Sequence, residues 1–298
     1  MKKIFIVAIA VIFTACNQHI ISSSTPIINT EILNEKRQTI LAGHCSISSM
    51  QMGSYKEWYD KSYSSYNIDS SIIPQLQPLL QNKTVEIFLG SWCGDSKREV
   101  PRMLKILQAA SIDTSNIKII FVDNSTATYK QSPQHEEEGK CIHHVPTFIV
   151  YENNKELNRI VETPIISLEK DLLTILNHEP YQPNYKAILY WTQHVNRKNK
   201  TKDDEELKEL VGILKPLCKH QGELNAFGYV LLAQKKYKQA INIFKLNTFI
   251  YPDKSGVYDS LGEGYCTMGN KEQAKKNYEK VLSMDPKNEN AKKMLEKL

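Results

Sequence analysis

The sequence predicts an α/β domain, with a mixed central sheet flanked by helices, followed by an all-α domain of helical repeats. Short apolar runs rich in β-branched residues alternate with helical patterns over residues 41–180. From residue 221 onward the chain repeats itself every 34 residues. The 298 residues suffice for two domains with separate cores, and a composition of 41% hydrophobic and 24% charged residues is typical of folded proteins.

The α/β domain is predicted to run strand, helix, strand, helix, strand, strand, helix. Apolar residues at three- and four-residue spacing after Ser96 predict the first helix, and the polar residues 136–139 predict an exposed helix end. Asn153 and Asn154 predict a hairpin turn, and Ser167 can cap the last helix. The predicted strands are residues 84–89, 117–122, 145–151 and 156–161. Parallel strands joined by helices and closed by a hairpin form a small α/β sandwich.

The segments that flank these strands are predicted to be helical. Residues 31–80 favour short helices with an aromatic-rich stretch, which we expect to pack on the α/β domain as an N-terminal extension. Residues 181–220 are interpreted as a helical linker, because Pro183 and a polar run at 196–206 interrupt them.

The C-terminal part, residues 221–298, resembles a tetratricopeptide array. Apolar and small residues recur in register, and a proline follows each second helix. Residues 288–298 form a charged amphipathic helix that can cap the stack. Such arrays present a groove that can bind a peptide or protein, although dimerisation or packing on the first domain is an alternative. The matched pairs are Leu224/Tyr258, Phe227/Leu261, Gly228/Gly262, Leu231/Tyr265, Ala240/Ala274, Phe244/Tyr278 and Pro252/Pro286.

The N-terminus predicts export and lipidation. Lys2 and Lys3 precede an apolar stretch that ends before Cys16, so residues 1–15 have the layout of a signal peptide. The cysteine after a small residue resembles a bacterial lipobox, in which Cys16 is acylated and tethers the protein to a membrane. An ordinary signal peptide followed by an incidental cysteine is the alternative. By the same resemblance, Asn17 favours the outer membrane, facing the periplasm, with residues 16–40 as a tether and spacer.

Residues 90–96, with the sequence GSWCGDS, contain the motif that carries chemistry. They follow a strand and open a helix, and Val145-Pro146-Thr147 comes later in the chain. This combination resembles the thioredoxin superfamily over residues 40–185, and it looks especially like thioredoxin-like proteins of Bacteroidota. The resemblance implies a thioredoxin-like fold in which Pro146 is cis and lies beside Cys93. It also implies that Val145 offers backbone groups to a substrate, with Trp92, Gly94 and Asp95 lining the site.

The position of Cys93 at a strand-to-helix junction supports this interpretation. Backbone N–H groups at a helix N-terminus favour a thiolate, which is the species that attacks a disulfide. Lys97 and Arg98 add positive charge, whereas Asp95 opposes it. We expect His143 and His144 either to approach and tune Cys93 or to lie in a surface loop.

Two departures from the family pattern limit the chemistry. Ser96 stands where a second cysteine is usual, so its hydroxyl can hydrogen-bond the Cys93 thiolate but cannot resolve a mixed disulfide. Ile87 stands where many thioredoxins have a buried acid, and strand alternation turns Glu86 to the opposite face. Cys141 lies five residues before Pro146 and is either a resolving cysteine or an incidental thiol.

These residues leave three functional hypotheses. The first is monothiol disulfide exchange through Cys93 with a protein or a low-molecular-weight thiol or disulfide, which needs no cofactor and no metal. The second is a catalytically silent scaffold whose repeats bind a partner protein. The third is copper(I) binding by Cys93, Cys141, His143 and His144, whose spacing matches no compact metal motif. Nucleic acid is not expected, because the formal net charge of +5 falls to +3 once Lys2 and Lys3 are removed.

Overall fold

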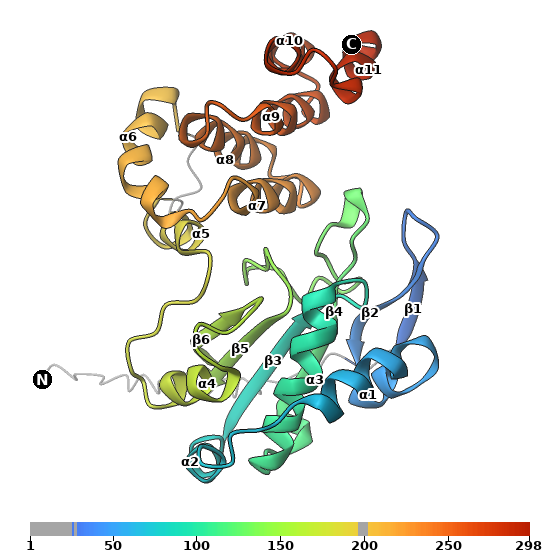
Figure 1. Cartoon of the computed structure of the whole chain (residues 1–298), viewed down its shortest axis with the longest axis vertical. Helices are drawn as coiled ribbons and strands as arrows, with labels where there is room; N and C mark the ends of the chain where they lie inside the picture. Colours follow the sequence, from blue (N-terminus) through green and yellow to red (C-terminus); the bar gives the residue numbers. More distant parts are fainter. Residues whose placement is uncertain (1–25, 27–28, 196–201) are drawn as a thin grey trace, which may run out of the picture.

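The computed structural model describes residue 26 and residues 29–195 and 202–298. An N-terminal part built on a six-stranded mixed sheet (the sheet domain, residues 29–180) is followed by an all-helical part (the helical domain, residues 186–298) (Figure 1). The predicted combination of an α/β domain and helical repeats is compatible with this architecture. The predicted signal peptide and Cys16 lie outside the described residues.

The sheet has the strand order β1-β2-β4-β3-β5-β6. Strands β3 and β4 are parallel, whereas the other neighbouring pairs are antiparallel. Asn153 and Asn154 both have positive φ in the tight turn between β5 and β6, which confirms the predicted hairpin. The strands are β1 Thr30–Leu33, β2 Thr39–Cys45, β3 Lys83–Leu89, β4 Ile117–Phe121, β5 Thr147–Glu152 and β6 Lys155–Val161.

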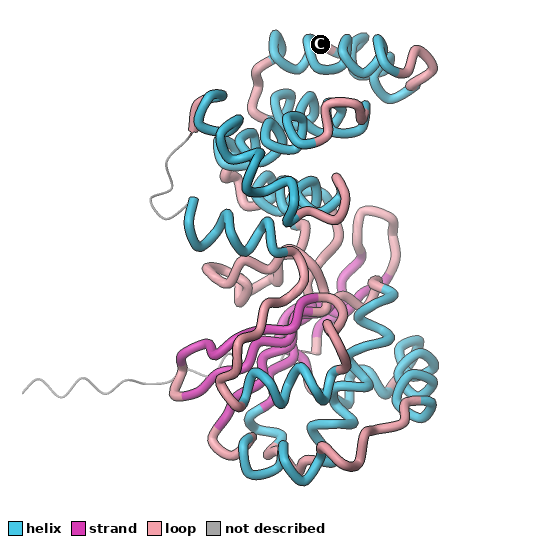
Figure 2. The backbone as a smooth tube through the Cα atoms, turned by 60° about the vertical axis from the view of Figure 1, so that its left-hand side comes forward, coloured by secondary structure: helices cyan, strands magenta, loops and turns pink. Residues whose placement is uncertain are grey.

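The two faces of the sheet bury different clusters. Alternate residues of β3, such as Ile87, enter the main core together with the helices of the sheet domain. Phe88 points to the other face and packs with Val145, Trp92 and Cys93. Figure 2 shows the helices of the sheet domain on one side of the sheet and the helical domain on the other. The helices are α1 Lys56–Ser65, α2 Ile73–Leu79, α3 Gly94–Ala109 and α4 Leu168–Leu176, and Ser167 caps α4 as predicted.

Two sequence predictions about the sheet domain are wrong. Residues 30–45 form the β1–β2 hairpin, so the predicted tether ends before residue 40 and the start of the 31–80 segment is not helical. No α-helix joins β4 to β5: within residues 122–146 the described helical structure is the short 3₁₀ turn Thr126–Thr128. This connection is tied instead to the hairpin turn, because Thr126 N donates to Glu35 Oε1 at 2.7 Å.

The helical domain consists of stacked antiparallel helices whose contacts repeat. A Cβ at Gly228 would lie 2.3 Å from the ring of Phe244, and 34 residues later a Cβ at Gly262 would lie 3.1 Å from Tyr278. These glycines therefore let each helix pair approach closely. The helices are α5 Lys186–Tyr190, continued by a π-helical turn over Trp191–Val195, then α6 Asp204–Leu214, α7 Gly222–Ala233, α8 Tyr237–Ile250, α9 Ser255–Thr267, α10 Lys271–Met284 and α11 Glu289–Lys297.

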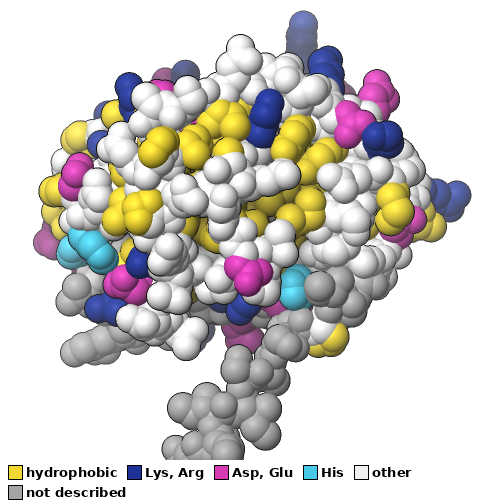
Figure 3. All heavy atoms as spheres, turned by 90° about the horizontal axis from the view of Figure 1, so that it is seen from below, with side chains coloured by type: hydrophobic (Ala, Val, Ile, Leu, Met, Phe, Trp, Pro, Cys, Tyr) yellow, Lys and Arg dark blue, Asp and Glu magenta, His cyan; other side chains and the backbone are white. Residues whose placement is uncertain are grey.

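The two domains meet at the loop before β5. The ring of His143 packs edge-on against Phe227 of α7 and against Tyr185 of the linker, with ring centroids 6.1 and 5.5 Å apart. The opposite end of the sheet domain carries hydrophobic side chains gathered across its surface (Figure 3). His143 lies in the same loop as Val145, which packs with Cys93. The face of the sheet that packs with Cys93 is therefore the one turned toward the helical domain.

Candidate functional site

Cys93 occupies the N-cap position of α3, as predicted. Its backbone is extended, with φ −91° and ψ 127°, and its carbonyl accepts the first helical hydrogen bond from Lys97 N at 3.0 Å. The half-buried thiol donates to the carbonyl of Val145 at 3.2 Å. The Val145–Pro146 bond is cis, as the sequence resemblance implies. The fold thus brings together Cys93, Val145 and Pro146 from two distant segments.

The residues next to Cys93 hold its loop in place. Trp92 Nε1 donates to Val122 O at 2.8 Å, and the Trp92 ring covers Gly90 so closely that a Cβ there would lie 2.4 Å away. Ser96 is fully buried, and its hydroxyl accepts from Gly90 N at 3.2 Å. The Ser96 hydroxyl therefore supports the loop that precedes α3.

Neighbouring charges are largely paired with each other. Asp95 accepts from Arg98 Nη2 at 2.5 Å, and Arg98 Nε donates to the buried Glu99 at 2.6 Å. Arg98 therefore contributes less to the field at Cys93 than its sequence position predicts. Gly94 is exposed and Lys97 is half-buried at the same end of the helix.

Lys130 is the site residue that sequence reasoning missed. It is 5% exposed, and its amine lies over the rings of Trp92 and Tyr129, at 5.1 and 4.9 Å from their centroids. Burial lowers the pKa of Lys130 to about 8, while the nearby acidic groups of Cys93 and Glu162 oppose that shift. A cation is thus buried within electrostatic reach of the thiol. Nothing in the polar stretch around residue 130 signals this, because the contact depends on the path of the loop.

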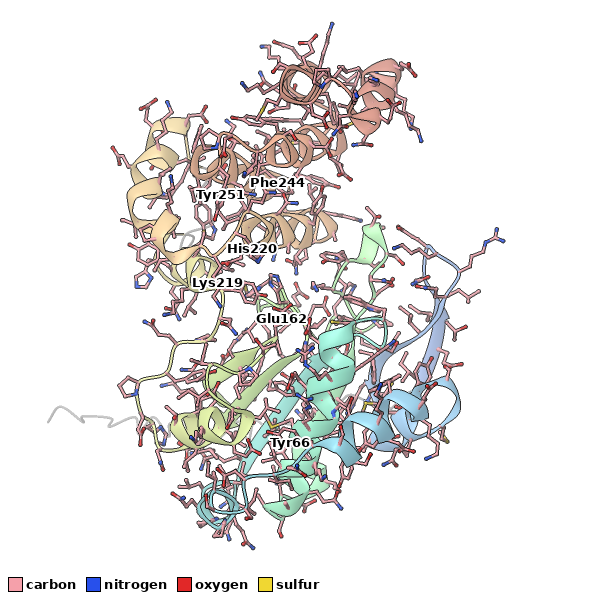
Figure 4. The ribbon with its side chains drawn as sticks, viewed as in Figure 1. Tyr66, Glu162, Lys219, His220, Phe244 and Tyr251 are labelled. Carbon is pink, nitrogen blue, oxygen red and sulfur yellow. The ribbon has the colours of Figure 1, made fainter. Side chains whose placement is uncertain are left out.

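Glu162 and Tyr185 border the other side of the site. The backbone N–H of Glu162 donates to Pro146 O at 2.6 Å, and its carboxylate accepts from the hydroxyl of Tyr185. The ring of Tyr185 stacks on His144 at a centroid separation of 3.7 Å. Figure 4 places Glu162 on the edge of the sheet domain that faces His220 of the helical domain.

The two histidines are packed into the junction between the domains. His143 is 7% exposed, which rules out the predicted surface loop for this residue, and His144 is half-buried. Burial lowers the pKa of His143 well below its ordinary value and that of His144 to about 3, and nearby positive charge lowers both further. Their Nδ1 atoms lie 2.8 Å apart, as expected for two neutral imidazoles that share one hydrogen bond.

Cys141 lies apart from the packing cluster of Cys93. It packs against the core of the helical domain, whereas Cys93 packs with Phe88 and Val145. Burial raises the pKa of Cys141 to about 11, so its thiol is protonated at neutral pH. All five described cysteines are free. Within the described ranges, no group of three His, Cys, Asp or Glu side chains is placed to hold a metal ion.

We compared the chain with known protein families and with curated proteins. No family model and no curated protein matches it. Across residues 29–195 and 202–298, no helix is both long and apolar enough to cross a bilayer. The Cys93 site is therefore the main basis for a functional proposal.

Proposed function

We propose that this chain is an extracytoplasmic thioredoxin-like lipoprotein that performs monothiol disulfide exchange through Cys93. The observation that carries the proposal is the placement of the Cys93 thiol at the start of α3, 3.2 Å from the carbonyl that precedes Pro146. A thiol at a helix N-terminus is favoured as the thiolate, because the unpaired backbone N–H groups there carry partial positive charge. The buried Lys130 adds a full positive charge to the same side.

The reaction needs one cysteine and one external thiol. The Cys93 thiolate attacks one sulfur of a substrate disulfide, so that a Cys93–substrate disulfide forms and the other substrate sulfur leaves as a thiolate that takes up a proton. A low-molecular-weight thiol then attacks the substrate sulfur of the mixed disulfide and releases Cys93. The substrate then carries a disulfide with the external thiol. A second molecule of the external thiol reduces this disulfide.

An external thiol is the better resolving group because the chain supplies none in the right place. Ser96 has no sulfur, and its hydroxyl is engaged with Gly90 N. Cys141 is protonated at neutral pH and packs with the other domain. Resolution by Cys141 would require that loop to leave its packing.

The remaining parts of the proposal are export and repeat identity. The layout of residues 1–16 supports acylation of Cys16 and a membrane-anchored protein, in the outer membrane and facing the periplasm. The period of 34 residues, together with the repeated Gly228–Phe244 and Gly262–Tyr278 contacts, supports tetratricopeptide repeats that bind a peptide or protein partner.

One observation favours a second candidate function. The full burial of Ser96 and its bond to Gly90 stabilise the active-site loop without any sulfur chemistry. A catalytically silent scaffold, in which the repeats bind a partner protein, could keep such a loop for stability alone. In that case Cys93 would be dispensable for every partner and phenotype.

The test is to trap mixed disulfides in cells by acid quenching and alkylation. We expect adducts that dithiothreitol releases from the native chain and that disappear in Cys93→Ala. Cys266→Ala is the matched control, because Cys266 is a half-buried thiol on α9 of the helical domain. Adducts that persist in Cys93→Ala would contradict the proposal, and the absence of any Cys93-dependent adduct would favour the scaffold.

The same preparation tests how the adduct is resolved. We expect Cys141→Ser to leave the amount and lifetime of Cys93 adducts unchanged. Accumulation of adducts in Cys141→Ser would instead identify Cys141 as the resolving cysteine.

A further inference from the structure

Tyr185 is the linker residue that packs on the loop before Pro146. Its backbone is left-handed, with φ 67° and ψ 45°, which a bulky residue adopts only when its surroundings hold it there. The ring stacks on His144 with an interplanar angle of 13°, and it meets His143 edge-on. Its hydroxyl donates to Glu162. Both the ring and the hydroxyl are therefore fixed.

The contacts of Tyr185 adjoin those of the reacting sulfur. His144 immediately precedes Val145, whose carbonyl accepts from the Cys93 thiol, and Glu162 N donates to Pro146 O. Burial raises the pKa of Tyr185, the hydrogen bond to Glu162 raises it further, and the charge of Asp95, two residues after Cys93, is close enough to add to the same shift. Tyr185 is thus part of the wall around the site.

The backbone partner that an extended substrate would need is covered. Val145 is only 2% exposed, and its carbonyl is already occupied by the Cys93 thiol. The linker that carries Tyr185 is fastened on both sides: Asn184 Nδ2 donates to Thr163 O at 2.8 Å, and Lys219 Nζ donates to Asn184 Oδ1 at 2.9 Å. Because Tyr185 stacks on His144, a substrate chain that approaches Val145 along residues 143–145 meets the Tyr185 ring.

We infer that Tyr185 determines specificity by closing one side of the Cys93 site, so that low-molecular-weight disulfides react and disulfides on folded proteins do not. This inference rests on the proposed function, since it names the substrate class of the same site. Residue Cys93 is half-exposed and the neighbouring Gly94 is exposed, so we expect a small molecule to reach the sulfur from the α3 side. A space of about 580 Å³ behind Tyr185, lined also by Cys141 and His143, gives the ring room to withdraw when its contacts are removed.

The experiment compares two maleimides of different size on the full chain. N-Ethylmaleimide and a maleimide that carries a polyethylene-glycol chain share one reactive group, and modification of Cys93 is followed by peptide mass spectrometry. The measured quantity is the rate with the large reagent divided by the rate with the small one. In Tyr185→Ala we expect this ratio to rise about tenfold, because a ring stack and a hydrogen bond to a carboxylate are lost together.

Two further variants distinguish closure of the site by Tyr185 from a general loosening of the linker. Tyr181→Ala is the matched control, because Tyr181 lies on the same linker but its hydroxyl donates to Asp171 at 2.9 Å, away from residues 143–146. Its ratio should equal that of the native chain. Tyr185→Phe keeps the ring and loses only the bond to Glu162, so its ratio should rise by less than in Tyr185→Ala.

The inference fails if the ratio in Tyr185→Ala equals the native ratio, or if Tyr181→Ala raises it equally. Should Tyr185→Ala not fold, Tyr185→Phe and Glu162→Gln take its place, and unchanged ratios in both would overturn the inference. Alkylation does not depend on disulfide exchange. A changed ratio without any cellular adduct would therefore support closure of the site by Tyr185 while refuting the proposed function. Cellular adducts together with an unchanged ratio would support the proposed function and refute closure by Tyr185.

Discussion

Replacement of Lys130 by methionine should make the protein more stable and the Cys93 thiol less reactive. Burial lowers the pKa of Lys130 from 10.5 to about 8, and a depression of this size corresponds to a cost of about 3 kcal/mol for keeping the amine charged below pH 8. The cation–π contacts with Trp92 and Tyr129 offset about 0.5–1 kcal/mol each. The net gain in the free energy of unfolding of Lys130→Met at neutral pH is therefore about 1–2 kcal/mol.

The pH dependence of this gain has a defined sign. The unfolded chain keeps the Lys130 proton up to the ordinary pKa of 10.5, whereas the folded chain releases it near pH 8. The cost is therefore complete below pH 8 and is relieved as the pH rises toward 10.5. Urea denaturation at neutral pH and at about pH 9.5 should show the advantage of Lys130→Met shrinking.

Reactivity should change in the opposite direction to stability. Loss of one nearby positive charge should slow the alkylation of Cys93 by iodoacetamide roughly fivefold, which corresponds to about 1 kcal/mol of charge–charge interaction. Lys170→Met, at an exposed position on α4, is the control and should change neither quantity. A Lys130→Met variant that loses stability at neutral pH, or whose Cys93 reacts as fast as in the native chain, would refute this account of the site.

Three other substitutions test separate parts of the structure. Gly228→Ala should lower the free energy of unfolding by about 1–3 kcal/mol in urea denaturation, because its Cβ would overlap the ring of Phe244. Ser96→Cys should shorten the lifetime of Cys93 adducts about tenfold or more in the trapping assay, since it adds an internal resolving thiol. His144 has a folded pKa of about 3, so only the unfolded chain takes up its proton between pH 6.5 and 3 and stability falls with pH there. His144→Gln should therefore remove about 1–2 kcal/mol of the loss measured between neutral pH and pH 5.

Each of these predictions has its own control or contrary result. Gly256→Ala, where a Cβ meets nothing within 4 Å, should leave stability nearly unchanged. Adducts of Ser96→Cys as long-lived as native ones would show that position 96 cannot reach the mixed disulfide. A pH profile of His144→Gln that overlays the native profile would show that His144 takes up its proton as readily in the folded chain as in the unfolded chain.

The elements predicted correctly from the sequence are those fixed by local rules. Asn153 and Asn154 tolerate the left-handed backbone of a tight hairpin turn, and the Ser167 hydroxyl accepts from Lys170 N at the start of α4. Cys93 could be placed at a helix start because the strand before it and the apolar periodicity after it are both short-range signals. In each case the residues that determine the element lie within one or two turns of it.

The features that were missed depend on contacts between distant segments. The β1–β2 hairpin closes through Asn34, whose side chain also donates to Asn124 Oδ1 at 3.0 Å, 90 residues away in the chain. The polar residues 136–139 predict a helix end after β4, but Asp123 accepts from Asn124 N and Ser125 N and turns the backbone into a loop. The positions of Lys130 and Tyr185 follow from that loop and from the linker, so neither has a local signature.

The packing of His143 between Tyr185 and Phe227 affects whether the two domains can be separated. The sequence suggests two units that could be separated near residue 180, but Cys141 and His143 of the first unit pack against the second. A fragment that ends at residue 180 would expose this surface to water, and we expect it to be less soluble and less stable than the intact chain. The two halves should therefore unfold as one cooperative unit, and domain exchange with unrelated proteins would have to replace both sides of the junction together.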